Sequence, residues 1–237
     1  MKNSTKEIIN EINTYRDESK AAFLPRFFKT GKGEYGEGDQ FIGVVVPNLR
    51  IVAKKHFDAD FDTLRELLAS PYHEYRLTAL LALTYRYAKL KDHTSRETCV
   101  NFYVSQMDAI NNWDLVDLSC YKILGHWLFD KDKQLLYDWA KENHLWKQRI
   151  AMISCMHFVK QGEFKDALAI ADLLQHHPHD LIHKAVGWIL REIGKEDEQL
   201  LVDYLTPRYK EMPRTMLRYA IERFEEGKRK AFLNSTI

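Results

Sequence analysis

The chain has 237 residues and a mass of 28.0 kDa, with 45% hydrophobic and 29% charged residues, a composition that favours a folded core over intrinsic disorder. Its 35 basic and 34 acidic residues give a formal net charge of +1, which excludes a global polycation, so a nucleic-acid surface would need local clustering of basic residues. The three cysteines, Cys99, Cys120 and Cys155, form no Cys-x-x-Cys pair, and we expect buried thiols in a reducing compartment.

The first residues, Met1-Lys2-Asn3-Ser4, lead into a charged amphipathic stretch rather than an apolar leader. No run of about eighteen apolar residues occurs anywhere in the sequence. These features predict a cytoplasmic protein with neither a signal peptide nor a membrane span.

The N-terminal part is expected to be helical up to a glycine-rich segment. Residues 4–19 have an apolar stripe at helical spacing, and a second short helix should carry Phe27 and Phe28. Residues 30–43 follow, with the pattern Gly-x-Gly-x-x-Gly-x-Gly, which includes a match to the dinucleotide-binding fingerprint. No strand precedes this pattern and no βαβ unit surrounds it, so we predict a flexible surface loop.

The remainder of the chain is a series of helical patterns. Pro47 suits the first turn of one helix, and Ser70 with Pro71 should begin the next, as cap and first helical residue. Later patterns cover about 94–109, 114–129, 131–143, 145–161, 163–175, 179–193, 196–206 and 212–226. Since no convincing strand pattern occurs, the fold class is predicted to be all-α.

Four of the helical segments have a similar middle part. The similar parts are residues 75–81, 116–122, 148–154 and 183–189. Their second residues are Arg76, Asp117, Arg149 and Lys184, and the intervals between these positions are 41, 32 and 35 residues. Helix pairs that repeat at such intervals are typical of a HEAT-like solenoid, an α-α superhelix. We therefore predict a single HEAT-like repeat domain over residues 1–237.

The repeat register indicates a concave groove with basic residues along its length, an acidic centre and aromatic walls. Equivalent residues of stacked pairs line up on one surface, which places three basic residues and the central Asp117 along it. Basic side chains can follow a phosphate backbone, and indoles can stack on bases or on a cationic ring. The tryptophans near the aligned positions are Trp113, Trp146 and Trp188.

Structural roles are the alternatives for these residues. Asp114 can cap the helix that follows it, and Asp117 can simply interact with the helix dipole. Trp188 can belong to the core, while Arg76 and Lys184 can be solvated or paired with carboxylates.

A histidine cluster raises the question of a metal site. His179 and His183 are four residues apart, and His176 and His177 precede them. No cysteine lies nearby and no glutamate stands in the metalloprotease arrangement, so no metal site is expected. The basic run Lys228-Arg229-Lys230 is expected to be a solvated end of the chain.

The chain resembles the AlkD family of DNA alkylation-repair glycosylases, which are built from HEAT-like repeats. The resemblance extends from about Phe23 to Glu226. It is carried, in order, by Val44-x-Val46-Pro47-x-Leu49-Arg50, Trp113-Asp114-x-Val116-Asp117, Trp146-x-Gln148-Arg149-x-Ala151 and Lys184-Ala185-x-Gly187-Trp188-x-Leu190-Arg191-Glu192.

The resemblance implies hydrolysis of the N-glycosidic bond of cationic N3- or N7-alkylated purines in duplex DNA. Asp117 would be the catalytic carboxylate, Trp113 and Trp188 would contact the lesion, and Arg149 would be the groove arginine. Two positions depart from the family pattern. Phe27 stands where the best-known member has a tyrosine, and His157 stands where that member has a lysine.

The same resemblance implies alkylated duplex DNA as the partner. The sequence has no oligomerisation signal such as a heptad seam, so a monomer is the default expectation. No cofactor is expected, because water would be the nucleophile and the leaving base is already charged. Arg76 and Lys184 would add phosphate contacts by their place in the repeat register. Two alternatives remain at this stage: a non-catalytic module that binds damaged or branched DNA, and a scaffold for protein interactions.

Overall fold

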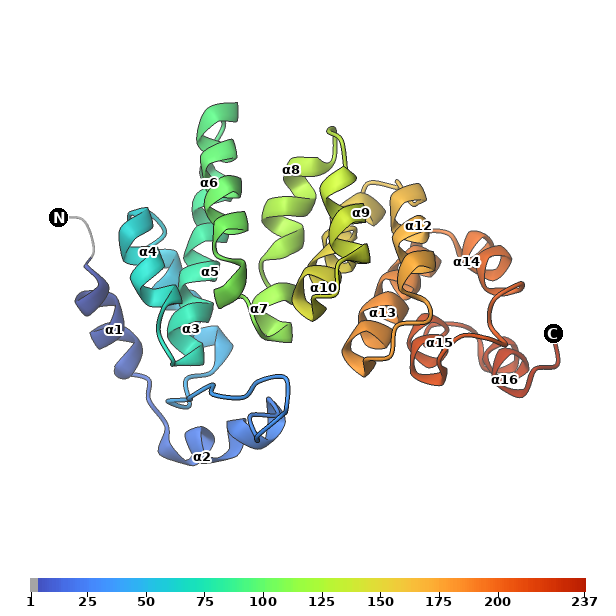
Figure 1. Cartoon of the computed structure of the whole chain (residues 1–237), viewed down its shortest axis with the longest axis horizontal. Helices are drawn as coiled ribbons and strands as arrows, with labels where there is room; N and C mark the ends of the chain where they lie inside the picture. The colour runs from blue at the N-terminus through green and yellow to red at the C-terminus, as the bar shows by residue number, and fades with distance from the viewer. Residues whose placement is uncertain (1–3) are drawn as a thin grey trace. The chain divides into compact units, whose positions relative to one another are not determined.

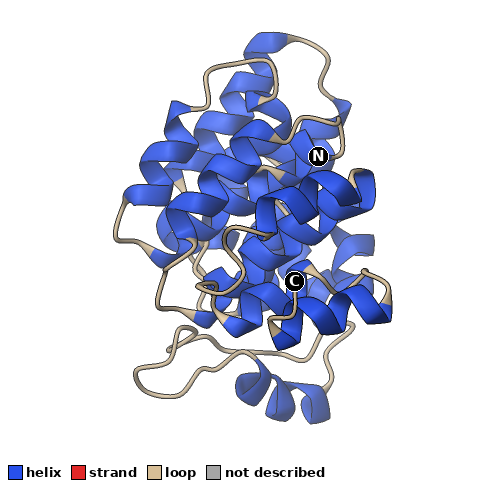
Figure 2. Ribbon diagram, turned by 90° about the vertical axis from the view of Figure 1, so that its right-hand side faces the viewer, coloured by secondary structure: helices blue, strands red, loops and turns tan. Residues whose placement is uncertain are grey.

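The computed structural model describes residues 4–237, and this part of the chain folds into helices joined by loops (Figure 2). The prediction of an all-α helical-repeat fold is confirmed. By internal contacts the chain divides into two compact units, one up to Ile123 and one from Leu124 onward, and each is described by itself. The prediction of a single domain over 1–237 stays a prediction.

In the first unit, α5 is the central helix against which most of the others pack. Thus α3 packs on α5, α4 also packs on α5, and α5 in turn contacts α7. The elements are α1 (Thr5–Asn13), α2 (Glu18–Phe27), α3 (Val46–Lys55), α4 (Phe61–Leu68), α5 (His73–Lys89), α6 (His93–Ser105), the 3-10 turn η1 (Met107–Ala109) and α7 (Trp113–Asp117) (Figure 1).

The second unit is built in a similar way around α10 and α13. Helix α10 packs on α9 and on α13, and α13 packs on α12, α14 and α15. After the π-helical segment η2 (Tyr121–Gly125), the elements are α8 (His126–Leu128), α9 (Gln134–Lys141), α10 (Leu145–Ser154), α11 (Met156–Val159), α12 (Lys165–Leu174), α13 (Asp180–Glu196), α14 (Glu198–Leu205), α15 (Arg214–Ala220) and α16 (Glu226–Asn234).

Aspartate side chains fix where several helices begin, because each accepts a hydrogen bond from a backbone N–H of the first turn. Asp60 accepts from Thr63 at 2.9 Å, Asp92 from Ser95 at 2.8 Å and Asp197 from Leu200 at 2.9 Å. Pro47 occupies the first turn of α3, as predicted. All three cysteines are buried thiols, and within residues 4–237 no helix has the length and apolarity to cross a membrane.

Two helix boundaries near the N-terminus differ from prediction. The helix expected over 4–19 ends at Asn13, because Asp17 caps a separate helix, α2, by accepting from the N–H of Lys20 at 3.1 Å. The helix expected to start at Ser70 starts at His73 instead. The carbonyl of Pro71 and the N–H of His73 both pair with the backbone of Gln40, which keeps this stretch extended.

The helix expected over 114–129 is interrupted after Asp117. Its first part, α7, has five residues, and the π-helical segment and α8 follow. Ser119 lies in the interruption and donates its hydroxyl to the carbonyl of Leu115, a side-chain bond that competes with regular helix.

The C-terminal basic run is largely exposed, as expected, but it lies in a helix, α16, that the sequence did not predict. Glu225 accepts from the N–H groups of Gly227 and Lys228 and caps α16, whose Phe232 is buried. Lys228 pairs with Glu198 at 2.5 Å. The helix was missed because the run of charges hides its short apolar stripe.

The glycine-rich segment between α2 and α3 is a loop, as predicted, but its second half is largely buried in the core and is not a surface loop. Phe41, Ile42 and Val44 are buried. Gly43 has φ +82°, and a Cβ there would lie 1.9 Å from the carbonyl oxygen of Asp17. This position therefore requires glycine both for its backbone conformation and for its close approach to α2.

We expect Gly43→Ala to destabilise the protein by about 3 kcal/mol or more, since it combines left-handed backbone strain with a backbone clash. Gly38→Ala is the matched control, because Gly38 has φ +89° and open space around it, and it should cost about 1–2 kcal/mol. Urea denaturation followed by circular dichroism measures both. Equal midpoints for the two variants would show that the Asp17 contact does not constrain the loop.

Candidate nucleic-acid site

The candidate site is built on α7, which carries Trp113 and Asp117 four residues apart on one helical face. Both side chains are half-buried. Asn112 caps the helix, because its side-chain oxygen accepts from the N–H of Trp113 at 2.8 Å. The cap predicted at Asp114 is therefore wrong: Asp114 is buried in the first turn, and its carboxylate faces His73.

An aromatic wall surrounds Trp113. Its ring stacks on Phe28, with the ring centroids 5.4 Å apart and the planes at 14°. Phe27 meets Trp113 edge-on at 5.7 Å and remains 53% exposed. Hence Phe28, which directly follows α2, supports the indole from the core side, while Phe27 at the end of α2 presents its ring to solvent.

The stack continues into the core. Phe28 stacks on Phe41 at 5.0 Å and lies against the imidazole of His73 at 4.7 Å. Phe41 also stacks on His73 at 5.0 Å. The exposed part of the wall is thus supported by buried rings from the glycine-rich segment and α5.

Below the wall lies a buried polar network centred on Asp39. Its carboxylate receives hydrogen bonds from Arg76 at 2.5 Å and Asn112 at 3.0 Å, and it lies 3.1 Å from Nδ1 of His73. The other ring nitrogen of His73 lies 2.9 Å from Asp114. The network therefore links the glycine-rich segment, α5 and the start of α7.

The two carboxylates keep His73 protonated. Burial alone would lower the pKa of His73, but the charge and hydrogen bond of Asp114, together with Asp39, raise it to about 9. Burial would likewise raise the pKa of Asp39, but the hydrogen bond from His73 and the charge of Arg76 lower it. The positive charges of His73 and Arg76 thus balance the carboxylates of Asp39 and Asp114 in the core.

Glu74 anchors the same segment by a second contact. Its carboxylate is 2% exposed and accepts backbone N–H groups from Ile42, Gly43 and Val44, the shortest at 2.8 Å. Burial raises the pKa of Glu74 despite these hydrogen bonds. The end of the glycine-rich segment therefore folds around a side chain of α5.

Arg76 is placed differently from the expectation of a phosphate contact. It is 6% exposed, and its guanidinium pairs with Asp39 inside the core. This position gives Arg76 a role in the buried network rather than at a surface that DNA can reach.

In the second unit, the predicted residues lie on three helices. Arg149 of α10 is 4% exposed and donates to the backbone carbonyl of Leu181 in α13. Trp188 of α13 is half-buried, whereas Trp146, expected in the groove wall, is buried. Gly187 allows α15 to approach, since a Cβ there would lie 2.5 Å from the carbonyl oxygen of Met216.

The remaining predicted cations are a surface lysine and a half-buried histidine. Lys184 pairs with Asp180 one turn earlier at 2.7 Å, and both side chains are exposed. His157 of α11 lies against His126, with ring centroids 5.0 Å apart. Burial, together with the charges of His126 and Lys160, lowers the pKa of His157 below its ordinary 6.5, so its ring is mostly neutral at pH 7.

The histidine cluster is occupied by protein contacts. His177 bonds to the side chain of Gln148 at 3.0 Å, and His183 bonds to the carbonyl of His177 at 2.5 Å. His179 accepts from the N–H of Leu181 at 3.1 Å. Within residues 4–237, no group of histidine, cysteine or acidic side chains has the arrangement of a metal site.

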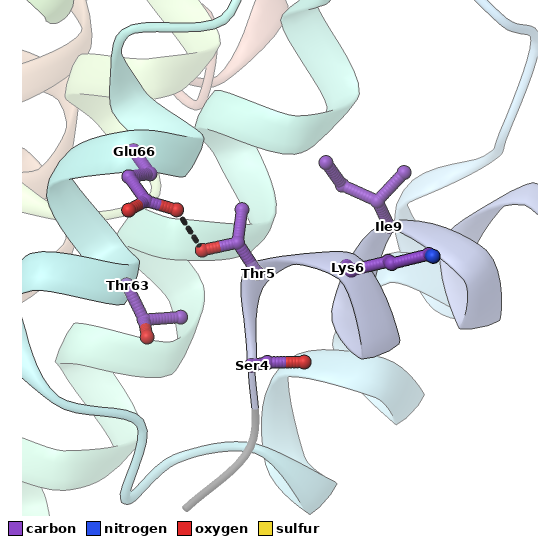
Figure 3. A pocket seen from close by; sticks show the side chains of 6 residues that line it. All are labelled: Ser4, Thr5, Lys6, Ile9, Thr63 and Glu66. Carbon is purple, nitrogen blue, oxygen red and sulfur yellow. Dashed lines mark hydrogen bonds between the residues drawn. The ribbon is translucent and has the colours of Figure 1, made fainter.

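A surface depression of about 530 Å³ lies elsewhere in the first unit, between α1 and α4 (Figure 3). Its residues are small, polar or partly aliphatic, and Thr5 donates to Glu66 across it. It shares no residue with the aromatic wall, and its lining has no aromatic side chain on which a base could stack.

Sequence reasoning missed three residues that support the site: Asp39, His73 and Phe28. Each lies far from α7 in sequence, and a lone aspartate or histidine in a loop or helix start gives no signal by itself. Asn112 was in the stretch singled out by the sequence, but its role as the cap was assigned to its neighbour Asp114.

Comparisons with known proteins identify both a protein family and a shared fold. The model of a family described as DNA alkylation repair enzyme matches residues 8–224. The chain is similar to a solved structure described as a predicted DNA alkylation repair enzyme from Enterococcus faecalis, with a TM-score of 0.68 and 14% identity over 89% of this chain and 97% of that chain.

A second similar structure is AlkD2 from Streptococcus mutans, with a TM-score of 0.54 and 15% identity over 88% of this chain and 99% of that chain. At these identities the two structures show a shared fold. A comparison with curated proteins gives no match.

The His73 network predicts how stability depends on pH. Because the folded pKa of about 9 exceeds the ordinary 6.5, the stabilisation by protonated His73 is complete below pH 6.5 and is lost as pH rises through 9. The free energy of unfolding of the parent should therefore exceed that of His73→Gln most at pH 6, with the difference shrinking toward pH 9.5. A difference that stays constant over this range would contradict a protonated His73.

Proposed function

Because the chain belongs to the family of DNA alkylation repair enzymes, we propose that it is a DNA glycosylase that releases cationic N3- or N7-alkylated purines from duplex DNA. The observation that carries the proposal is the placement of Trp113 and Asp117 on one short helix, with the indole stacked on Phe28. The enzyme would act as a monomer with water as the nucleophile and without a cofactor.

Asp117 stabilises the transition state in this proposal. An alkylated purine is already positive, so it leaves without a general acid. As the N-glycosidic bond breaks, its electron pair moves to the purine nitrogen and positive charge grows at C1′ of the sugar. A carboxylate already in place stabilises this charge electrostatically, and water then adds to C1′ and gives a proton to solvent.

Trp113 and Phe27 provide affinity for the positively charged base. An aromatic face attracts a cation by about 0.5–2 kcal/mol, more when water is excluded. Phe27 keeps the ring of the family's tyrosine without its hydroxyl, and its exposed face lies beside Trp113. The two rings thus form a surface that favours a cationic purine over a neutral one.

Contacts to the DNA backbone are proposed for fewer residues than the repeat register suggested. Lys184 is exposed and can exchange its partner Asp180 for a phosphate at little cost. Trp188 is half-buried and stays a proposed lesion contact. The phosphate role of Arg149 rests on the family resemblance alone, because its guanidinium already binds Leu181.

A second candidate function is DNA binding without excision. Its support is the exposed ring of Phe27 beside Trp113, which can stack on a base whether or not that base is released. This candidate predicts salt-sensitive binding of duplex DNA with no release of base.

Asp117→Asn should reduce the release of N7-methylguanine from methylated duplex DNA by about 100-fold or more, because the amide cannot stabilise positive charge at C1′. Affinity for undamaged duplex should change little. Asp108→Asn, which alters an exposed carboxylate of the same unit, is the matched control and should keep parental activity. Parental release by Asp117→Asn would refute the assigned role. Binding without release by the parent would favour the second candidate.

Phe27→Ala should slow the release of N3-methyladenine by about 2- to 30-fold, the loss of one cation–π contact. Phe23→Ala is the control, because Phe23 lies one turn earlier on α2 and is 62% exposed. Single-turnover rates on one methylated duplex compare the two. An equal effect of both variants would mean that α2 acts through general hydrophobic contact and not through the ring beside Trp113.

A further inference from the structure

His73 is a buried titratable residue that the proposed chemistry does not use. It is 2% exposed and lies at the junction of three elements. Its ring nitrogens face Asp114 of α7 and Asp39 of the glycine-rich segment, and its ring face packs on Phe28 and Phe41. It therefore touches both the helix that carries Asp117 and the rings that support Trp113.

Helix α7 cannot fix its own orientation. It has five residues, and a helix of that length is unstable without contacts from the rest of the protein. Its start is held by two side chains that both lead to the buried network. Asn112 bonds to Asp39, and Asp114 bonds to His73. The other end of α7 leads through a turn at 118–119 into the π-helical segment η2, and Leu115 and Val116 are buried in the core.

We propose that His73 is a positioning residue for base excision, which joins Asp114 to Asp39 and thereby holds Trp113 and Asp117 in the geometry that the reaction requires. The inference rests on the proposed function for its effect on excision. Its effect on the placement of Trp113 is independent of that function.

Hydrogen bonds from His73 to both carboxylates require the protonated form of its imidazole ring. A neutral imidazole has one N–H donor, whereas both ring nitrogens here face carboxylate oxygens, at 2.9 and 3.1 Å. The charged groups around the ring are Asp114 from α7, Asp39 from the glycine-rich segment, and Glu74 and Arg76 from its own helix. Loss of the proton would release one of the two elements that His73 joins.

The variant His73→Gln tests the proposal because glutamine is uncharged and cannot bridge both carboxylates as the imidazolium does. His56→Gln is the matched control. His56 is also buried in the first unit and bonds a carboxylate, Glu11, at 2.7 Å, but it links α3 to α1 and lies outside the aromatic wall. The control therefore reports the effect of losing a buried histidine–carboxylate contact as such.

In single-turnover release of N7-methylguanine, His73→Gln should be slower than the parent by about 10- to 100-fold, the effect of misplacing a catalytic group by about 1 Å. Its Kd for undamaged duplex should stay within about twofold of the parent, and His56→Gln should keep the parental rate. An unchanged rate in His73→Gln, or an equal loss in both variants, would overturn the proposal.

A second readout does not depend on excision. In protein labelled with 5-fluorotryptophan, the ¹⁹F resonance of Trp113 can be assigned with Trp113→Phe. It should shift and broaden in His73→Gln but not in His56→Gln. If the parent releases no base, the proposed function fails while this resonance still decides whether His73 positions Trp113. An unshifted resonance in His73→Gln would overturn the inference.

A third variant covers the case in which His73→Gln does not fold. Asp114→Asn keeps a hydrogen-bond acceptor beside the His73 ring and removes the negative charge of the carboxylate that faces it. The pH at which the Trp113 resonance titrates should then move from about 9 in the parent toward neutrality. The same midpoint in both proteins would show that His73 does not couple Asp114 to Trp113.

Discussion

The structure of the first unit depends on the pairing of charges inside its core. A buried carboxylate is unfavourable unless it is hydrogen-bonded and balanced, and Asp39 meets both conditions through Arg76, Asn112 and His73. Because these partners come from α5 and from the cap of α7, satisfying one carboxylate fixes the relation of three chain segments. The aromatic wall rests on this arrangement, since Phe28 and Phe41 pack directly on His73.

The glycine-rich segment has a structural role in this arrangement. Its glycine pattern includes a match to the dinucleotide-binding fingerprint, yet the N–H groups of Gly31 and Gly33 bind the carboxylates of Glu34 and Glu37. Further along, the N–H groups of Ile42, Gly43 and Val44 bind the carboxylate of Glu74. Carboxylates of the protein therefore occupy these N–H groups, where a phosphate-binding loop would bind its ligand. What the segment contributes to the candidate site is indirect: it supplies Asp39 and Phe41, which support α7 and the rings around Trp113.

The aligned basic residues Arg76, Arg149 and Lys184 can either face the groove or bind polar groups within the protein. In a solenoid, equivalent positions face the neighbouring repeat as well as the groove. Arg149 uses its position to donate to the carbonyl of Leu181 in the next inner helix, and Arg76 uses it to bind Asp39. Both guanidiniums satisfy polar groups within the protein, whereas Lys184 stays at the surface with Asp180.

The local features of this protein follow from its amino-acid pattern alone. Apolar spacing predicted nearly all of the helices, and the repeat interval predicted their stacking, because both depend on residues close together in the chain. The stretch Trp113 to Asp117 also stood out, since a helix places residues four apart on one face.

Contacts between distant segments set which polar side chains are buried and which groups they pair with. Asp39 and Asn112 are 73 residues apart, and His73 and Asp114 are 41 apart, so no local sequence pattern predicts their contacts. The same is true of helix ends that depend on distant groups. His73 begins α5 because Gln40 pairs with the preceding backbone, and Asp114 was mistaken for a cap because its partner lies on another helix. Where burial and charge pairing involve distant segments, their energy outweighs the local preference of the sequence.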